Sequence, residues 1–448
     1  MLKHTIGVLI TLAALTGSLV LPSFADSQAR IVRLSYTEGD VQIDRNAGQG
    51  YEKAFLNLPI IQGAKLRAGH DGFAEVEFED GSTVRITPGT TVVFPQLILR
   101  DSGTKVSSVD LRQGTVYVTF AGQKDHDFAL TFGAERVTFA TPVHLRLALG
   151  YSKASLAVFK GDAEVEGPSG TVAVGKKESA TFDFTASDRY TLAKNVADNP
   201  YDSWDQQQSQ YYQRYVKNNV TSASAGLPYS YGATDLSYFG AYAPVPGYGM
   251  MWQPFFVGAG WDPFMNGAWA FYPGFGYSWA SAYPWGWMPF HYGSWAFAPG
   301  YGWGWQPGGS WTGLNNLPRP VINAPPGFQT PVPPAIPGHG LLVVNRGGVP
   351  APMTSASRVV IRNNSAGLGI NRGSIQNLGR ISHQVEQRGF ARATLSAAPS
   401  AAAAYSMPAV GFAPAAASSR SAPSMGTAAR SSLSAPAAGM GGVGGSHK

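Results

Sequence analysis

The sequence contains no cysteine, and acidic residues are nearly absent from its second half. Without cysteine the chain can form no disulfide, no thiolate metal site, no cysteine nucleophile and no lipid-modified N-terminal cysteine. The HExxH, GxSxG and Gly-rich phosphate-binding motifs are also missing, and His70, His126 and His144 are far apart in the sequence. We therefore expect a protein that is not an enzyme, with no catalytic residues, no metal and no cofactor.

Charged residues divide the chain into three segments. Acidic residues are concentrated in residues 26–205, whereas Asp235 and Asp262 are the only charges in residues 218–318. Residues 319–448 contain ten arginines and one lysine against a single glutamate. Charge asymmetry of this kind usually follows domain boundaries.

Residues 1–25 have the three parts of an export signal. Lys3 supplies a positive charge, residues 6–21 are apolar, and residues 23–25 (SFA) form a small-x-small cleavage site. The alternative is a retained single-span anchor, because the apolar run is close to the shortest that spans a bilayer. The helix breaker Pro22 favours cleavage. No later segment is apolar and free of turn residues for long enough to span a membrane, so we expect an exported protein in the periplasm or at the cell surface, with no span after cleavage.

Residues 26–190 are predicted to form an all-β domain. Apolar and polar positions alternate with a period of two, as in GDVQID, AEVEFEDGSTVRIT and SLAVFKGDAEVEG. The pairs Asp80-Gly81 and Gly161-Asp162 lie between alternating runs, which indicates short hairpins. Many short strands separated by regular turns indicate a β-sandwich or roll.

One hairpin of this domain carries a cluster of acidic residues. The cluster comprises Glu75, Glu77, Glu79 and Asp80. Strand alternation turns Val76, Phe78, Val84 and Ile86 inward, and it turns the three glutamates and Arg85 outward. The carboxylates could offer oxygen ligands to a cation. We favour a solvated strand face, because like charges on one face repel one another unless they are hydrated.

The order of these motifs resembles the FecR domain, a module known from the envelope sensor of ferric dicitrate uptake. The shared features are the G-x-x-L-x-x-G step (residues 63–69), the DGS turn (residues 80–82) and the Thr141-Pro142 pair. The resemblance covers about 150 residues and implies a FecR-like fold in the cell envelope. The sensor also has a cytoplasmic domain that binds a sigma factor. Only five residues precede the apolar run here, so we expect no sigma-factor contact.

A linking helix is predicted over residues 199–217. Pro200 lies near its start, acidic residues occupy the first turn, and Lys217 lies near the end. Trp204, Gln208, Tyr211 and Tyr215 recur every three or four residues. We expect this stripe to pack on the β domain or on the segment that follows, not to bind a ligand.

Residues 240–313 contain a tandem repeat rich in Trp, Tyr and Gly. WDPFMNGAWAFYPGFGYSW (residues 261–279) aligns without a gap on WMPFHYGSWAFAPGYGWGW (residues 287–305), and eleven of nineteen positions are identical. A half-copy, PGYGMMW, covers residues 246–252. The fixed period predicts stacked units, each a small β-hairpin with Pro-Gly at the centre of a type II turn. Glycines at alternate positions leave room for a neighbouring ring to lie across the backbone.

The rings of the repeat have two interpretations. One is a compact aromatic core, because a buried Trp offsets the ordering of only about one or two residues. The other is that some indoles stay exposed as stacking platforms for sugars, or as a cage for quaternary ammonium groups. We favour packing, and both can coexist on opposite faces. The ligand-binding candidates are Trp261, Trp269, Trp279, Trp287, His291, Tyr292, Trp295 and Trp305.

This block also resembles Trp/Tyr/Gly-rich C-terminal regions that are attached to FecR domains in exported bacterial proteins. The shared features are PWGWMPFHYGSW (residues 284–295) and GWGWQPG (residues 302–308). The resemblance implies an architecture but no activity.

The C-terminal segment is basic. Residues 317–392 are Pro-rich and then Arg-bearing, and short strands are expected near residues 341–344 and 359–361. Residues 393–448 are Ala, Ser, Pro and Gly with few large apolar side chains, so we expect a disordered tail. Its arginines suit polyanions such as acidic polysaccharide or lipid phosphate, and the alternative is a solubilising tail. Export makes nucleic acid the least suitable partner, and no nucleic-acid recognition fold is visible.

Together these features predict a non-enzymatic cell-envelope protein. The FecR-like module is followed by an aromatic-repeat module that has a binding or structural role, in contact with cell-wall or surface polysaccharide or with another envelope protein. The alternative is a periplasmic sensor or partner-binding subunit of a signalling or uptake system, without a sigma-factor-binding domain of its own.

Overall fold

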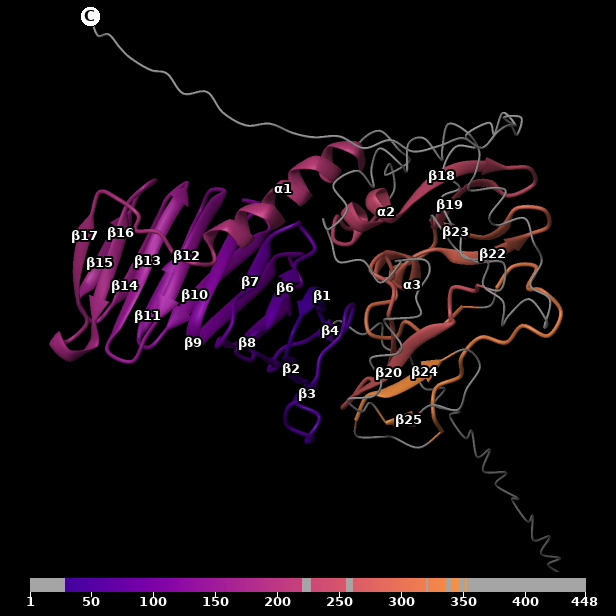
Figure 1. Ribbon diagram of the computed structural model, residues 1–448, viewed down its shortest axis with the longest axis horizontal. Helices are drawn as coiled ribbons and strands as arrows, with labels where there is room; N and C mark the ends of the chain where they lie inside the picture. The colour runs from indigo at the N-terminus through magenta and orange to yellow at the C-terminus, as the bar shows by residue number, and fades with distance from the viewer. Residues whose placement is uncertain are drawn as a thin grey trace, which may run out of the picture. The chain divides into compact units, whose positions relative to one another are not determined.

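The computed structural model describes residues 29–219, 227–254, 261–319, 321–335, 340–345 and 351–352. These residues form mostly β-strands together with three α-helices, which confirms the all-β class (Figure 1). The export signal, the strand expected near residues 359–361 and the C-terminal tail lie outside the described residues. No helix in the described part of the chain is long and apolar enough to cross a membrane.

The β domain contains 17 strands in two hydrogen-bonded sheets that share strand β9 (Lys105–Phe120). Sheet A follows the order β4 (Pro59–Ile60), β1 (Val32–Glu38), β6 (Phe73–Glu77), β7 (Thr83–Ile86), β9, β12 (Val143–Leu149), β13 (Lys153–Lys160), β16 (Ser179–Asp183) and β17 (Arg189–Ala193). Sheet B follows the order β3 (Glu52–Lys53), β2 (Val41–Asp44), β5 (Lys65–Ala68), β8 (Thr91–Leu99), β9, β10 (His126–Phe132), β11 (Glu135–Thr138), β14 (Ala163–Gly167) and β15 (Gly170–Val174). A short 3-10 helix, η1 (Phe184–Ala186), joins β16 to β17.

Strand β9 passes from one sheet to the other at Gly114. Its N-terminal part pairs with β8 and β10 in sheet B, and its C-terminal part pairs with β7 and β12 in sheet A. Gly114 has a φ of +91°, and a Cβ at this position would lie 2.3 Å from Oγ1 of Thr90. Both the backbone angle and the close approach therefore require glycine.

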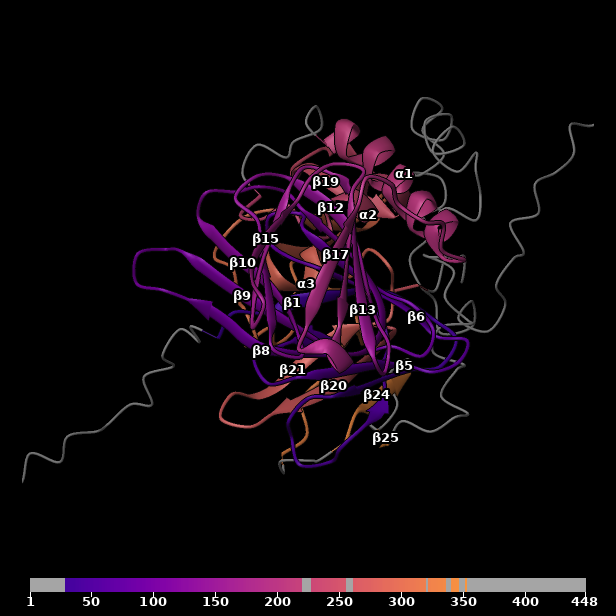
Figure 2. The ribbon, with the colours of Figure 1, turned by 90° about the vertical axis from the view of Figure 1, so that its left-hand side faces the viewer.

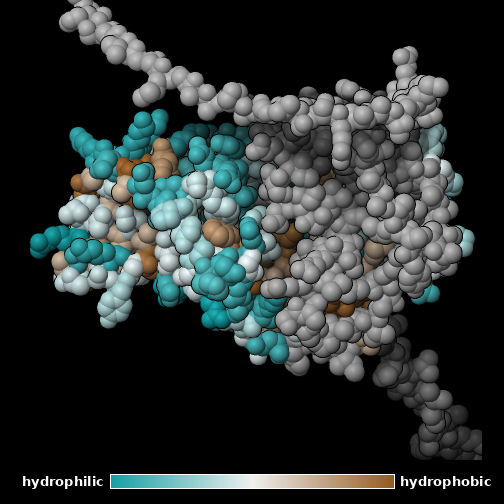
Figure 3. Space-filling view, viewed as in Figure 1, coloured by the Kyte–Doolittle hydropathy of each residue, from teal (hydrophilic) through white to brown (hydrophobic). Residues whose placement is uncertain are grey.

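Apolar side chains of both sheets form one core, as the alternation predicted. Val76, Phe78, Val84 and Ile86 are all buried in it. The surface of the β domain that is visible in Figure 3 is mainly hydrophilic.

The prediction of a solvated outer face for these strands is wrong. Glu75, Glu77, Glu79 and Arg85 are at most 7% exposed. Helix α1 (Asp202–Asn219) lies against this face of sheet A (Figure 2). The segment leading into helix α2 (Ala233–Phe239) also contacts it, because the backbone N–H of Gly232 donates to Glu77. Strand alternation shows which side chains share a face, but it does not show what covers that face.

The predicted linking helix is α1. Trp204 packs against Phe73 of the β domain, with 4.8 Å between ring centroids, and Tyr211 donates a hydrogen bond to Asp235 of α2. The stripe therefore packs both on the β domain and on the segment that follows, whereas the side chain of Tyr215 lies outside the described residues.

The described residues of the aromatic module form three hairpins and a short helix, α3 (Met288–His291). The hairpins are β18 (Gly240–Val245) with β19 (Gly249–Pro254), β20 (Asn266–Tyr272) with β21 (Gly276–Ser281), and β22 (Ser294–Ala298) with β23 (Gly302–Gln306). The first and third hairpins share a sheet in which Trp252 pairs with Trp305. The second pairs with β24 (Leu342–Asn345), which continues to β25 (Ala351–Pro352) and confirms the strand expected near residues 341–344.

The two aligned copies have the same hydrogen-bond register. Trp269 lies opposite Trp279 in the second hairpin, and Trp295 lies opposite Trp305 in the third. The Pro-Gly turns are as predicted: Gly274 and Gly300 have φ values of +82° and +79°, and each turn is closed by a backbone hydrogen bond. The half-copy is part of a third complete hairpin, in which β18 pairs with β19. Sequence comparison missed the first strand of this hairpin because β18 lacks the tryptophan of the motif.

Candidate functional site

The aromatic residues of the repeat are interior. Each of the six candidate tryptophans is at most 3% exposed, and His291 is 1% exposed. The packing interpretation therefore accounts for them, and the exposed-platform interpretation is wrong for these indoles. The physical reason is that each hairpin is too small to bury its rings alone, so the rings of neighbouring hairpins enclose one another. Ligand binding by the eight candidates stays a prediction.

The structure brings most of the candidates into one cluster. Trp261, Trp269, Trp279, Trp295 and Trp305 share a core with Trp252, Trp285 and Trp303. Trp287 packs instead with the core that contains the β-domain side chains. Tyr292 is half-buried, and its backbone carbonyl accepts a hydrogen bond of 2.7 Å from the indole of Trp305.

His291 lies between two indoles. Its ring is 4.2 Å from that of Trp287 and stacks on Trp311 at 5.0 Å. Nδ1 is 2.9 Å from the carbonyl oxygen of Gly313, and Nε2 is 3.3 Å from the side-chain nitrogen of Asn316. Burial lowers the pKa of His291 to about 3, so the ring is a neutral packing element at physiological pH.

Buried polar side chains of the β domain donate hydrogen bonds to backbone carbonyls of the aromatic module. Arg33 of β1 is completely buried, pairs with Glu77 at 3.0 Å and Asp235 at 2.6 Å, and donates to the carbonyl of Pro284. Asn57 donates to the carbonyls of Ser281 and Tyr283. The two regions are therefore joined by buried contacts.

The covered side of sheet A is a polar face whose side chains lie in rows across the strands. One row follows the pairs Arg33–Glu77, Glu77–Thr83, Thr83–Thr119, Thr119–His144 and His144–Lys160. Directly paired residues project to the same side, so this row crosses six strands on one face. We refer to this surface as the polar face.

Arg85 and Asp205 form the centre of the contact between the polar face and α1. Arg85 pairs with Glu75 at 2.8 Å and with Asp205 at 2.6 Å, and His144 Nε2 is 2.8 Å from the second oxygen of Asp205. Burial alone would raise the pKa of Asp205, but the hydrogen bond from His144 and the charge of Arg85 hold it below its ordinary value. The carboxylate is therefore ionised.

A second ion pair anchors the start of α1. Arg146 of β12 pairs with Asp202 at 2.6 Å, and Tyr117 donates a hydrogen bond of 2.7 Å to the same carboxylate. Burial and the hydrogen bond to Asp202 raise the pKa of Tyr117 above its ordinary value, so this phenol remains a donor. The acidic first turn that the sequence suggested as a helix-start signal thus also attaches the helix to the sheet.

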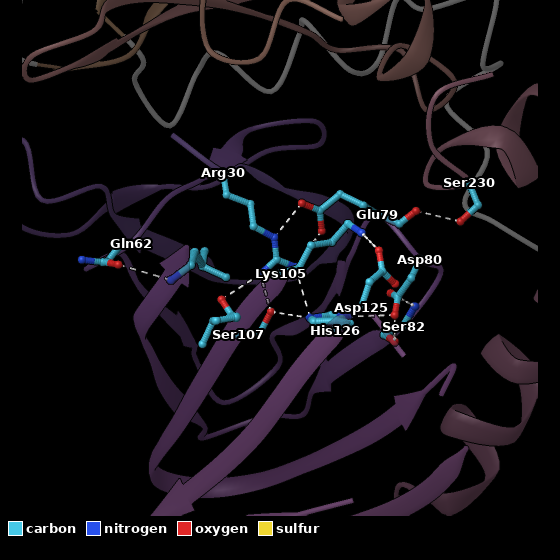
Figure 4. Close-up of polar contacts among 12 residues, drawn as sticks. Arg30, Gln62, Glu79, Asp80, Ser82, Lys105, Ser107, Asp125, His126 and Ser230 are labelled. Atoms are coloured by element: carbon cyan, nitrogen blue, oxygen red, sulfur yellow. Dashed lines mark hydrogen bonds and ion pairs between the residues drawn. The ribbon is translucent and has the colours of Figure 1, made fainter. Parts of the chain in front are cut away.

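A further network lies at the end of the DGS hairpin (Figure 4). Arg30 binds Glu79 through two hydrogen bonds of 2.7 and 2.8 Å, and it also donates to Ser107. His126 is 2.8 Å from Asp80 and 2.6 Å from the hydroxyl of Ser107. Burial opposes the ionisation of Asp80, yet His126 and Ser82 lower its pKa below the ordinary value.

Ser107, His126 and Asp80 are linked in the order of a hydrolase triad. The hydroxyl of Ser107 is buried, and Arg30 donates to it at 2.7 Å. It faces no solvent from which a substrate could approach. We therefore interpret the network as structural.

These networks also exclude the shared cation site that was the alternative for the acidic cluster. Each carboxylate has a cationic or imidazole partner of its own. The pairs are Glu75–Arg85, Glu77–Arg33, Glu79–Arg30 and Asp80–His126. Sequence reasoning missed these partners because alternation assigns residues to a face without pairing strands.

A cavity of about 640 Å³ lies between the polar face and α1. Its walls include Thr83, Thr119 and His144 from the sheet, and Asp205 and Ser209 from the helix. No sequence motif pointed to it. The only available signals were the acidic residues at the start of α1 and the threonines Thr83 of β7 and Thr119 of β9.

Two families match parts of the chain. Residues 64–164 match the family described as FecR protein, and residues 233–315 match a family of unknown function, DUF6600. A search of curated proteins finds no match.

Two crystal structures of a proposed anti-sigma factor from Parabacteroides distasonis are similar to part of the chain. They are 16% and 14% identical to it, and the matches cover 30% and 33% of this chain and 60% and 63% of the solved chains. The TM-score is 0.26 for both. The chain thus spans less than two thirds of the solved proteins.

The family matches fall on the β domain and on the aromatic module respectively, in agreement with the resemblances of their motifs. Residues 64–164 of the β domain are therefore similar to the FecR family, and residues 233–315, which include the repeat, are similar to DUF6600.

Proposed function

We propose that this chain is an exported, non-enzymatic regulatory module of the cell envelope, in which the FecR domain and the DUF6600 region form one partner-binding unit. The match to the FecR family supports a regulatory or sensor role. The N-terminal export signal supports a periplasmic or surface location. The partner that fits best is another envelope protein.

The observation that carries this proposal is the buried attachment of the two regions. Arg33 of the FecR domain is fully buried and pairs with Glu77 of its own sheet and Asp235 of the DUF6600 region. A contact of this kind favours a fixed combined surface over two independently binding modules. The buried indoles also favour a protein partner over a polysaccharide, since none of the six candidate indoles offers an exposed ring face.

The test is crosslinking in the cell that encodes the protein. A photoreactive amino acid at Tyr151 or Leu192, both well exposed, should capture a discrete envelope protein. The same substitution at the buried Trp269 provides a control that should capture no partner. Fractionation should find the mature chain, beginning at Asp26, outside the cytoplasm.

Three outcomes would contradict the proposal. They are retention of the full-length chain in the cytoplasm, crosslinking to wall polymer alone, and hydrolysis of a wall polymer by the purified chain. The last result would place the protein among enzymes.

A further inference from the structure

We propose that the cavity between the polar face and α1 binds a small, neutral, hydroxyl-rich ligand such as a monosaccharide or disaccharide. This inference does not depend on the proposed function, because it concerns a small molecule in a cavity lined by the β domain, α1 and the segment around Ser230 and Thr234, and not a protein partner. The argument rests on size, on one unsatisfied buried hydroxyl and on the pairing of the charges in the wall.

The size of the cavity suits a small molecule. Its volume of about 640 Å³ lies within the range of roughly 300–1,000 Å³ that is typical of ligand pockets. Gln206 and Gln213 of α1 line it and are exposed, so the cavity communicates with solvent on the side of the helix.

Thr83 supplies a hydroxyl group that lacks a partner. The residue is 2% exposed and lies in the cavity wall on β7, and its Oγ1 makes no hydrogen bond to the described residues. An unbonded buried hydroxyl is unfavourable, because water no longer satisfies it. In the same row, Thr119 already bonds to His144, so Thr83 is the member of this pair that remains available.

The charges in the wall favour a neutral ligand. Asp202 is paired with Arg146, and Asp205 is paired with Arg85 and His144. The carboxylates of Glu77 and Asp80, which complete the acidic lining, are paired with Arg33 and His126. Lys160 is exposed, so its ammonium group is hydrated.

Paired carboxylates and guanidinium groups can still accept or donate further hydrogen bonds. A ligand hydroxyl both donates and accepts, so it can satisfy Thr83 and approach an ion pair without introducing a charge that would need its own partner. The rings of Phe159 and Tyr212 add apolar surface to the same cavity. A sugar ring combines hydroxyl groups with apolar C–H faces and matches both kinds of wall.

The experiment is calorimetric titration of the mature chain with glucose, N-acetylglucosamine and maltose, with glucuronate and glucosamine as charged comparators. We expect at least one neutral sugar to bind at millimolar concentration. Thr83→Val, which removes the hydroxyl and keeps the shape, should weaken that binding by about five- to tenfold. The matched control Thr181→Val, on β16 of the same sheet and outside the cavity, should leave the affinity unchanged.

A second variant keeps the proposal falsifiable if Thr83→Val fails to fold. Gln206→Trp changes an exposed position on α1 and should block the cavity, and circular dichroism should show an intact fold. Four results would overturn the proposal: no neutral sugar binds the native chain, only the charged sugars bind, Gln206→Trp binds as well as the native chain, or the two threonine variants have the same affinity.

Discussion

At the scale of single residues, the buried arginines in and beside sheet A matter because each neutralises carboxylates that are removed from water. Arg30, Arg33 and Arg85 face Glu79, Glu77 and Glu75 respectively, and the arginine side chains are at most 3% exposed. Removal of one partner of a buried ion pair leaves the other as an uncompensated charge, which is far more harmful than the loss of a surface pair.

Arg33→Met should lower the free energy of unfolding by about 3–5 kcal/mol, because it leaves Glu77 and Asp235 buried without their common cation. Arg100→Met is the control. The side chains of Arg100 and Asp127 are each 56% exposed, and the loss of their pair should change stability by less than about 1 kcal/mol. Urea denaturation measures both values. Similar losses for the two variants would show that Arg33 does not join the two regions.

His291 should make the protein sensitive to mild acid. Burial lowers the pKa of His291 to about 3, whereas the ring in the unfolded chain titrates near its ordinary value of 6.5. Below about pH 6.5 the unfolded chain therefore binds a proton that the folded chain does not, and stability falls with decreasing pH by up to about 1.4 kcal/mol per pH unit.

His291→Asn removes this titration and keeps a donor for the carbonyl of Gly313. The decrease in stability between about pH 7 and about pH 5 should be roughly 2 kcal/mol smaller in the variant than in the native chain. Urea midpoints at the two pH values provide the measurement. The remaining histidines are common to both proteins, so equal decreases would exclude a neutral buried His291.

At the scale of elements, the three hairpins share a close contact between a glycine and an indole ring. A Cβ at Gly240, Gly267 or Gly293 would lie 2.3–2.4 Å from the indole of Trp252, Trp279 or Trp305 respectively. The tryptophan of the second strand of each hairpin thus lies across a glycine at or just before the start of the first strand. The sequence predicted such an approach at the glycines in alternate positions, but Gly274, Gly276 and Gly300 have no atom within 4 Å of a Cβ position, so the prediction named the wrong glycines.

Gly267→Ala should destabilise the protein by about 1–3 kcal/mol, because its methyl group must displace the indole of Trp279. The φ of Gly267 is not in the left-handed region, so the effect is steric. Gly150→Ala is the matched control, since its nearest atom is 3.4 Å away, and it should change stability by less than about 0.5 kcal/mol. Thermal denaturation compares the two, and equal stability would show that the ring does not lie on this glycine.

The elements also show how far sequence reasoning extends. Alternation correctly predicted that Val76 and Phe78 face the core, and the 26-residue offset correctly predicted equivalent hairpins, because both patterns are local. The polar face was not predictable in this way. The bond from Arg85 to Asp205 joins residues 120 positions apart, and the bond from Arg33 to Pro284 joins residues 251 positions apart. Such pairing depends on the tertiary arrangement, which neither composition nor periodicity encodes.

At the scale of the whole molecule, the β domain and the aromatic module belong to one compact unit. One apolar core contains β-domain residues together with Trp287, Tyr272 and Leu341. The tryptophans are distributed unevenly between the two regions. Of the 11 in the chain, Trp204 lies on α1, the other ten lie between residues 252 and 311, and the β-domain strands have none.

This distribution allows the two regions to be followed separately during unfolding. Tryptophan emission reports the aromatic module, and far-ultraviolet circular dichroism is dominated by the strands of the β domain. Because the regions share a core and buried ion pairs, the two signals should change at the same urea concentration. Separate midpoints would contradict the shared unit, and an unchanged β-domain midpoint in Arg33→Met would do so independently.

The crossing of β9 between the sheets constrains how the sandwich can come apart. Its 16 residues form a continuous strand that is central to both layers, with Gly114 at the point of transfer. Neither sheet can unfold while the other stays folded unless β9 loses its pairing on one side of Gly114. The sandwich should therefore unfold as a single cooperative unit centred on β9. The backbone amides of β9 should accordingly be among the last to exchange with heavy water.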